Sequence, residues 1–546
     1  MWRTAVVVLA YAAITTVMVS PLVNYSGLGV ASYPGDVRLI IWTLAWDNHA
    51  VLEGLPLFDA NVFHPAEQSL KYNEHLFGVS LFTLPIHAAT GNAVLAYNIV
   101  WLLSFVLNGI AMHALLRRYT GRELAAFAGA LVYTFSFYKM LHAHGHLHLV
   151  WTWLLPLSLL ALHRWNDRPS WGGALAWAFA VLLQALTSWY LAVMVALVNG
   201  AAVMLLAVRW RHDWRRRCVH VILAAALVGG CAWPFAREYR DLKPAAATEA
   251  AANAADLSGY LVPPQNTWLG RLWLARLGPG PRWIWGEQTL FIGWTALSLA
   301  LVGAVAGLRS RPRVTVFYLA VVIVAFALSL GPAVASGGEG WRVFDLLTLV
   351  PGLGAFRAPA RFAALVLLGL SVLVALAVAA FQSRSPRLTA VAVGVLLPLM
   401  LSEWYLVGFP LGKPQPFSSP PIYRRPELRQ ARAIVSLPEY RGTSQWYFGS
   451  DYLFYSMAHW RPIVNGFGRA EPPDHFRVVS HMTAFPGPNN ARTMRWLGVD
   501  YLVLHADRYG ARADEVVREA MQMQEYALVA RAGSDYLFRV TPEPAP

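Results

Sequence analysis

Long apolar blocks alternate with polar segments along the chain up to about residue 408. Eleven of these blocks approach the ~20 residues that an α-helix needs to cross a bilayer. A shorter block at 76–89 is typical of a re-entrant or interfacial helix. The predicted spans are 4–23, 93–116, 124–140, 149–164, 171–189, 191–208, 219–235, 289–308, 314–330, 361–381 and 388–408. The pattern therefore predicts a polytopic α-helical membrane protein.

Beyond Phe409 the hydrophobic pattern changes. A proline-rich stretch at 410–421 leads into short apolar runs, of which 433–437 and 501–505 are typical of β-strands. We expect a small extracytoplasmic α/β domain at 409–546. The membrane domain then comprises residues 1–408, including the outer loops 24–75, 236–288 and 331–360.

The charge pattern indicates how the chain is oriented. If the N-terminus is cytoplasmic, the inside loops are rich in arginine and hold only three acids, Glu123, Asp167 and Asp213. This is the positive-inside pattern, and it predicts a multi-pass protein of the inner (plasma) membrane with an extracytoplasmic C-terminus. Nearly all carboxylates then lie on the extracytoplasmic side, where any carboxylate chemistry must occur.

Composition excludes two other classes of protein. The 546 residues are 57% hydrophobic and 14% charged, which argues against a soluble multidomain protein. The net charge of +14 could suggest nucleic acid. However, much of the excess abuts the ends of spans, where anionic lipid headgroups account for it. We therefore expect membrane lipids, and not nucleic acid, as partners.

The first outer loop carries the leading catalytic candidate, Asp36. It follows a Pro-Gly pair at the start of a predicted helix, so it could equally be a helix cap. Asp36, Thr43 and Asp47 share one helical face among apolar residues, which is typical of a helix lying at a membrane interface. Eleven residues separate the two aspartates by ~16 Å, so both cannot act on one bond. Asp47 is therefore a separate candidate.

Two further groups of polar residues are candidates for the same face of the membrane. Glu74 and His75 precede a hydrophobic segment and are either site residues or ordinary interfacial residues. His142 and His146 are four residues apart, a spacing that permits both to bind one metal ion. Without an obvious third ligand nearby, they could equally be uncharged interfacial histidines.

A phosphate-binding group is predicted at the outer end of the tenth span. Arg357 and Arg361 flank Pro359 at the start of this helix, and a helix N-terminus with two arginines suits an anion at headgroup depth. Snorkelling to lipid phosphates is the alternative. Lys139 could add positive charge to this surface. Glu287 and Glu403 are further candidates, Glu403 because a carboxylate within a span is energetically costly.

Together, the segments "PGD" (34–36), "YNEHL" (72–76), "HGHLHLVWTWLLPLSLLALHR" (144–164), "GEQTLFIGW" (286–294) and "PGLGAFRAPARF" (351–362) resemble bacterial GT-C-type membrane glycosyltransferases. The resemblance implies a polyprenyl-phosphate-linked sugar donor and a general base in the first outer loop, a position that Asp36 matches. Many members carry a second acid beside this base. Here Val37 and Arg38 follow instead, which weakens the case for a metal-binding acid pair.

The predicted function is transfer of a hexosyl or pentosyl group to an acceptor hydroxyl on a glycan, lipid or protein, in envelope glycan or glycolipid synthesis. A base would deprotonate the acceptor, and cations would stabilise the departing lipid phosphate. Single displacement would invert the anomeric carbon. The sequence does not identify a cofactor, and a divalent metal ion is one possibility that it leaves open. The alternatives are a lipid-linked sugar flippase or transporter and a non-catalytic envelope assembly protein. Interrupted spans that are related by a repeat would favour the flippase or transporter.

Overall fold

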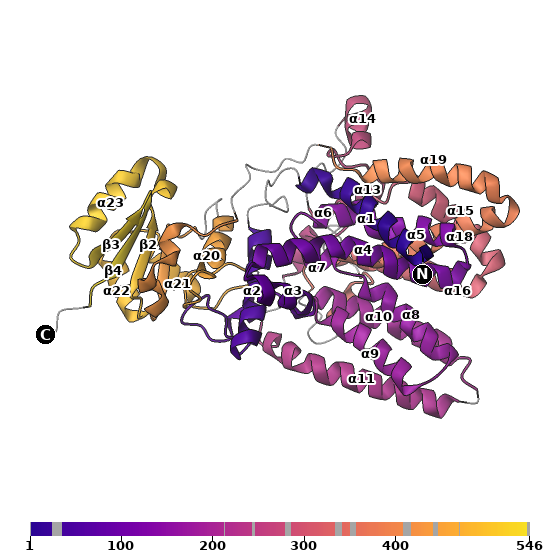
Figure 1. The fold of residues 1–546 in the computed structure, drawn as a ribbon, viewed down its shortest axis with the longest axis horizontal. Coiled ribbons are helices and arrows are strands. Elements are labelled where there is room, and N and C mark those ends of the chain that lie inside the picture. Colours follow the sequence, from indigo (N-terminus) through magenta and orange to yellow (C-terminus); the bar gives the residue numbers. More distant parts are fainter. Residues whose placement is uncertain are drawn as a thin grey trace. The chain divides into compact units, whose positions relative to one another are not determined.

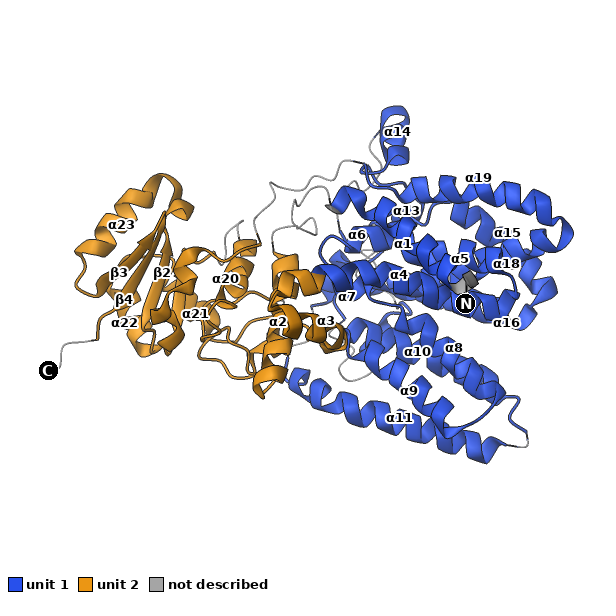
Figure 2. Ribbon diagram, viewed as in Figure 1, with its two compact units in different colours: residues 1–25, 98–410 blue, residues 26–97, 411–546 orange. Residues whose placement is uncertain are grey.

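The computed structural model describes residues 2–23, 35–211, 213–242, 246–278, 286–333, 341–349, 356–407, 417–440, 446–468 and 470–542. The proline-rich residues 410–416 lie outside this range. The chain forms two compact units, 1–25 with 98–410 and 26–97 with 411–546 (Figure 2). The first outer loop, which the sequence assigns to the membrane domain, therefore clusters with the C-terminal part of the chain.

The elements of unit 1 in its described residues are helices joined by loops (Figure 1). Its principal helices are α1 (Trp2–Val23), α4 (Ala93–Thr120, whose first turn belongs to unit 2), α5 (Glu123–Phe135), α6 (Phe137–His142), α7 (Leu147–Val150), α8 (Leu154–Asp167), α9 (Trp171–Ala185), α10 (Trp189–Ala207) and α11 (Trp214–Ala236). The chain continues with α12 (Ala247–Ala252), α13 (Leu257–Leu261), α14 (Trp268–Leu277), α15 (Trp294–Ser310), α16 (Pro312–Ser329), α17 (Asp345–Thr348), α18 (Ala363–Arg384) and α19 (Pro386–Trp404).

Each of the eleven predicted spans contains a helix. Among the described residues, seven helices are long and apolar enough to cross a membrane: α1, α4, α10, α11, α16, α18 with the turn before it, and α19. Four other apolar helices, including α5, α9 and α15, are shorter. The polytopic α-helical class is thus confirmed, and the number eleven stays a prediction.

Helix α18 forms the core of unit 1. It is apolar on all sides and almost entirely buried, which is the pattern of a helix surrounded by other helices. Glycines let its neighbours approach closely: a Cβ on Gly129 of α5 would lie within 2.4 Å of the Ser371 carbonyl oxygen. On α15, a Cβ at Gly303 would meet the Leu373 carbonyl in the same way. Larger side chains at either position would separate these helices.

Unit 2 contains a four-stranded sheet in the order β1-β2-β4-β3. The strands are β1 (Ile434–Leu437), β2 (Tyr501–His505), β3 (Tyr526–Ala532) and β4 (Asp535–Val540). Strands β1 and β2 are parallel, and the other pairs are antiparallel. Its helices are α2 (Asp36–Glu53), α3 (Phe77–Thr90), α20 (Gly449–Ser456), α21 (His475–Ser480), α22 (Pro488–Trp496) and α23 (Ala513–Gln522). The predicted C-terminal α/β fold and its two predicted strands are confirmed, and its extracytoplasmic location stays a prediction.

Backbone hydrogen bonds join the first loop to the C-terminal part of unit 2. The amides of Phe63 and His64 donate to the carbonyls of Asn465 and Ile463, at 3.1 and 3.0 Å, and the Ile463 amide donates back to Asn61 at 2.9 Å. Such pairing satisfies the backbone groups of both loop segments. Helix α2 is also enclosed, because it packs against α3 and α20 and most of its residues are buried. The apolar face that the sequence assigns to a membrane interface is therefore covered by protein.

Candidate functional site

A buried ion pair joins Arg361 and Glu287 in unit 1. Arg361 lies in the single turn Pro359–Phe362 that precedes α18, as the sequence predicts. Its Nε and one terminal nitrogen donate to Glu287 Oε1 at 3.0 and 2.5 Å, and its guanidinium lies 4.3 Å from the Tyr190 ring centre. Burial raises the pKa of the Glu287 carboxyl, but the adjacent guanidinium outweighs burial and holds that pKa below its ordinary value. Glu287 is therefore ionised.

The segment that carries Glu287 is fixed by its backbone. The amides of Leu290 and Ile292 donate to the carbonyls of Gly259 and Tyr260, at 3.0 and 3.1 Å. The two backbone segments lie so close together that position 259 requires glycine, because a Cβ on Gly259 would lie 2.2 Å from the Gln288 carbonyl oxygen. Glu287 is therefore held by the α13 region, and its position does not depend on Arg361 alone.

His142 and His146 lie beside this ion pair. His142 Nε2 is 3.7 Å from Glu287 Oε2, and the two Nδ1 atoms of the histidines are 3.3 Å apart. Burial lowers the pKa of His142 and keeps the imidazole neutral. No group of three or more His, Cys, Asp or Glu side chains in the described ranges is arranged to hold a metal ion. A metal ion on these histidines stays a prediction.

The two other predicted phosphate ligands differ in their access to solvent. Arg357 is about one-third exposed, and its NH1 atom lies 3.5 Å from Glu249 Oε1. Lys139 is fully buried, and its Nζ donates to the Leu149 carbonyl at 2.9 Å and to Thr152 Oγ1 at 2.6 Å. The expectation that Lys139 adds charge to a surface is wrong, because its ammonium is enclosed by these groups. Arg357 is thus the accessible cation of the predicted set.

Glu403 has a structural role in the fold. Its carboxylate accepts from the Thr295 amide at 3.2 Å and from the Thr295 hydroxyl at 2.8 Å, at the first turn of α15. A buried carboxylate here satisfies donors that a helix N-terminus leaves unpaired and interacts favourably with the helix dipole. This contact with Thr295 explains why a carboxylate, that of Glu403, lies near the end of a span.

The two aspartates of α2 lie in different surroundings. The helix begins at Asp36, so Gly35 (φ 121°) is at the N-cap position and Asp36 is the first helical residue, not the cap. Asp36 is half-buried in the first turn. Asp47 is fully buried and accepts a 2.5 Å hydrogen bond from Ser80 of α3, while its Oδ1 has no hydrogen-bond partner among the described residues. Burial raises the pKa of Asp47 to about 7, although Ser80 opposes this.

Glu74 and His75 lie in the connection between the first loop and α3. His75 is buried, and burial lowers its pKa to about 4, so the imidazole is neutral. Its ring packs edge-on to Phe58, with 6.4 Å between the ring centres. Glu74 is half-buried. Both residues belong to unit 2, whereas the Arg361 group belongs to unit 1.

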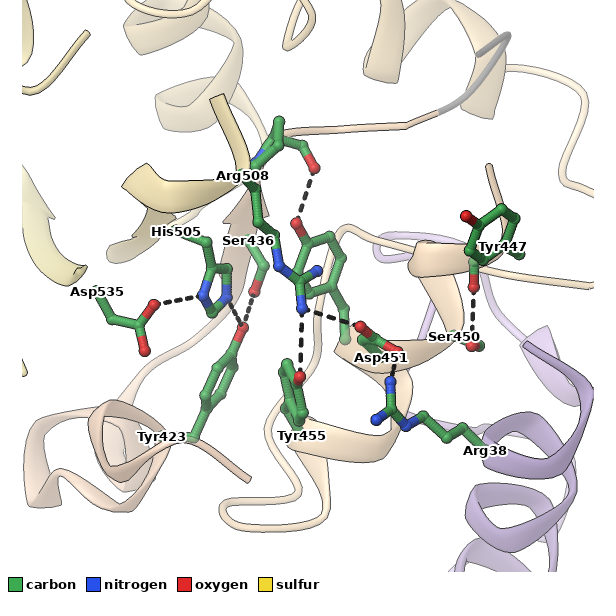
Figure 3. Close-up of polar contacts among 12 residues, drawn as sticks. Arg38, Tyr423, Ser436, Tyr447, Ser450, Asp451, Tyr455, His505, Arg508 and Asp535 are labelled. Atoms are coloured by element: carbon green, nitrogen blue, oxygen red, sulfur yellow. Dashed lines mark hydrogen bonds and ion pairs between the residues drawn. The ribbon is translucent and has the colours of Figure 1, made fainter. Parts of the chain in front are cut away.

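Unit 2 contains a buried polar network that the sequence does not predict (Figure 3). Asp451 of α20 forms ion pairs with Arg38 of α2 and with Arg508, the latter at 2.9 Å. A second chain of contacts runs from Asp535 through His505 to Tyr423, with distances of 2.7 and 2.9 Å. Arg508 lies within about 6 Å of four aromatic ring centres, those of Tyr440, Phe448, Tyr452 and Tyr455. The sequence signal is weak: His505 ends a predicted strand and Arg508 lies three residues beyond it.

Solved structures establish the fold of the chain. It is similar to the arabinofuranosyltransferase AftD from Mycobacteria, with a TM-score of 0.61 and 16% identity over 98% of this chain and 40% of that one. The chain thus spans about two fifths of the length of AftD. It also aligns with an oligosaccharyltransferase from Archaeoglobus fulgidus, with a TM-score of 0.49 and 14% identity over 98% of this chain and 73% of that one. The fold is that of GT-C-type membrane glycosyltransferases, as the sequence resemblance predicts.

Sequence comparison gives the family. No curated protein matches the chain in sequence. Residues 56–401, more than half of the chain, match the family described as "Domain of unknown function (DUF6311)", and the chain belongs to this family.

Proposed function

We propose that the chain is a glycosyltransferase that transfers a sugar from a polyprenyl-phosphate-linked donor to an acceptor hydroxyl on the extracytoplasmic face of the membrane. The extent of the fold match carries this proposal, since 98% of the chain aligns with a protein named as an arabinofuranosyltransferase. The aligned part includes residues of both units of this chain, although it covers only 40% of AftD. The sugar could be a pentose or a hexose.

The donor phosphate is assigned to the end of α18 where Arg357 and Arg361 lie. Arg361 is only 3% exposed and is already paired with Glu287, so we assign it the role of a positioning residue. Arg357 is the more accessible cation and is assigned the direct contact with phosphate. His142 Nε2 and Glu287 Oε2 are 3.7 Å apart and buried. They are close enough for both to contact one hydroxyl group of the sugar donor.

Asp36 is assigned the role of general base. The acceptor oxygen would attack the anomeric carbon while the bond from that carbon to the phosphate oxygen breaks, and the acceptor proton would pass to the Asp36 carboxylate. The departing phosphate is already ionised and needs no acid, provided that a cation such as Arg357 stabilises its charge. A single displacement of this kind inverts the anomeric carbon.

The test is transfer or hydrolysis of a panel of polyprenyl-phosphate sugars by the purified chain. Asp36→Asn removes the base with little change in volume, and we expect turnover to fall roughly 100-fold or more while donor binding persists. Asp59→Asn is the matched control, because Asp59 is an exposed acid of the same loop. Wild-type turnover in Asp36→Asn would remove Asp36 from the chemistry. Donor binding without turnover in wild type would favour the flippase or assembly function.

A second arm of the same experiment tests the phosphate assignment. Arg357→Gln should weaken donor binding by roughly 10- to 150-fold, because one charge-assisted contact contributes about 1.5–3 kcal/mol. Arg240→Gln is the control, since Arg240 is an exposed arginine in the outer loop 236–288. Equal losses in both variants would show that general surface charge, and not a site at Arg357, attracts the donor.

A further inference from the structure

Unit 1 has a cavity of about 890 Å³ at the opposite ends of its helices from Arg361. Four helices contribute: α4 with Arg118 and Tyr119, α8 with His163 and Asp167, α10 with Ala202 and Leu205, and α16 with Phe317 and Tyr318. The volume is within the range of roughly 300–1,000 Å³ that small-molecule sites occupy. The cavity therefore has room for a ligand of the size of a lipid headgroup.

Arginines dominate the charge around this cavity. The lining includes Arg118, Arg209, Arg211, Arg311 and Arg313, and the only carboxylate in it is Asp167. Asp167 pairs with Arg118 at 2.6 Å. Three others, Arg211, Arg311 and Arg313, form no ion pair within the described part of the chain. An excess of unpaired guanidinium groups around one cavity favours a phosphate-bearing anion, which arginine binds in bidentate fashion.

The remaining walls are amphipathic. On the floor, the Tyr119 hydroxyl lies 2.7 Å from His163 Nε2 and 3.0 Å from the Tyr318 hydroxyl, so neutral hydrogen-bonding groups of three helices meet there. One side is apolar, and its Leu205 and Val208 are 44% and 80% exposed. Exposed apolar side chains beside arginines suit a ligand that carries an acyl chain next to its phosphate. A soluble anion without an acyl chain would not contact these apolar side chains.

The length of α16 separates this cavity from the candidate donor site. Arg313 lies in the first turn of α16, and the 18 residues of that helix extend about 27 Å. Beyond its other end, a Cβ on Gly331 would lie 3.3 Å from Pro359, which shares a turn with Arg361. The two sites are thus separated by about the thickness of the hydrocarbon core of a bilayer.

From these observations we infer a second phosphate site: the arginine-lined cavity binds the phosphate of an anionic phospholipid on the membrane face opposite to Arg361. The bound headgroup would join α4, α8, α10 and α16 at the ends where the short loops lie. Basic cavities between membrane helices are a recognised setting for anionic headgroups. The inference is independent of the proposed transfer reaction.

The test measures lipid binding to the purified full chain in neutral detergent by native mass spectrometry. Phosphatidylglycerol is expected to bind with one tight site, and phosphatidylcholine is expected not to compete. The double substitution Arg311→Gln with Arg313→Gln should weaken phosphatidylglycerol binding roughly 25-fold, because each basic residue near an anionic lipid contributes a factor of about five. Arg311→Lys with Arg313→Lys keeps both charges but not the bidentate contacts, so it should bind more tightly than the Gln pair and less tightly than wild type, which distinguishes lost charge from misfolding.

Arg384→Gln with Arg387→Gln is the matched control. Both arginines are exposed and lie on the same predicted side of the membrane, but they do not line the cavity. Retained binding in this control supports the cavity as the site, whereas equal loss in both pairs would overturn it in favour of general surface charge. Unchanged binding in the Arg311/Arg313 pair would also overturn it. Pyrophosphate binding as tight as that of the lipid would overturn the assignment to an amphiphile.

Discussion

At the scale of single residues, Asp47 shows how burial changes the behaviour of a carboxyl group. Its pKa of about 7 lies well above the unfolded value near 4, because burial outweighs the hydrogen bond from Ser80. The folded state therefore binds more protons than the unfolded state between these values. Asp47 therefore contributes most to the free energy of unfolding below about pH 4. This contribution is lost as the pH rises through 7.

The substitution Asp47→Asn tests this pH dependence. The amide mimics the neutral carboxyl, so the variant should lose much less stability than wild type between pH 5 and pH 8. A shift of about three pKa units corresponds to at most about 4 kcal/mol over the whole titration, of which roughly 2.5 kcal/mol falls between pH 5 and pH 8. Thermal unfolding of the purified protein at both pH values measures the difference. Glu53→Gln, an exposed acid on the same helix, is the control, and an equal pH slope in wild type and Asp47→Asn would contradict the argument.

At the scale of elements, Glu403 of α19 stabilises the start of α15. Glu403→Ala should lower the free energy of unfolding by about 1–3 kcal/mol, because the half-buried Thr295 amide and hydroxyl would lose their acceptor. Glu403→Gln keeps an oxygen acceptor and should cost less. Thermal unfolding gives the comparison, and the double variant with Thr295→Val should cost little more than Glu403→Ala alone. Lost donor binding at unchanged stability would instead place Glu403 in the functional site.

The same scale shows what the sequence can predict. Helices and strands such as α18, β1 and β2 follow from local periodicity, so their positions agree with the sequence prediction within a few residues. Contacts between distant segments leave no such local signal. Arg361 and Glu287 are 74 residues apart, and Arg38 and Asp451 are 413 apart. The sequence therefore identifies Arg361 and Glu287 as candidates without indicating that they are partners.

Lys139 illustrates why burial is difficult to predict from a sequence. A lysine near the end of an apolar block usually extends towards the headgroups, and on that basis it is assigned to a surface. Its actual acceptors follow 10 and 13 residues later: the Leu149 carbonyl belongs to the short helix α7, and Thr152 Oγ1 lies just after that helix. The irregular backbone between α6 and α8 supplies these acceptors, and no periodic pattern reveals them.

At the scale of the whole molecule, unit 2 is assembled from two distant parts of the chain. Residues 26–97 and 411–546 share the unit, although most of unit 1 lies between them in sequence. Their connection includes the Arg38–Asp451 ion pair and the side chain of Asn61, which donates to Ser456 Oγ at 3.1 Å. A sequence prediction assigns domains to contiguous stretches, so it places the first loop with the spans that flank it. The contacts place it with the C-terminal sheet.

This arrangement predicts that the first loop cannot keep its structure without the C-terminal part. In a chain ending at residue 410, the amides of Phe63 and His64 lose the carbonyls of Asn465 and Ile463, and Asn61 loses Ser456. Hydrogen exchange of the loop amides should therefore be fast in the truncated chain and slow in the full chain. Amides of α18 serve as the internal control, because that helix lies wholly within unit 1. Slow exchange at Phe63 and His64 after truncation would show that residues 1–410 hold the loop by themselves, as contiguous domains would require.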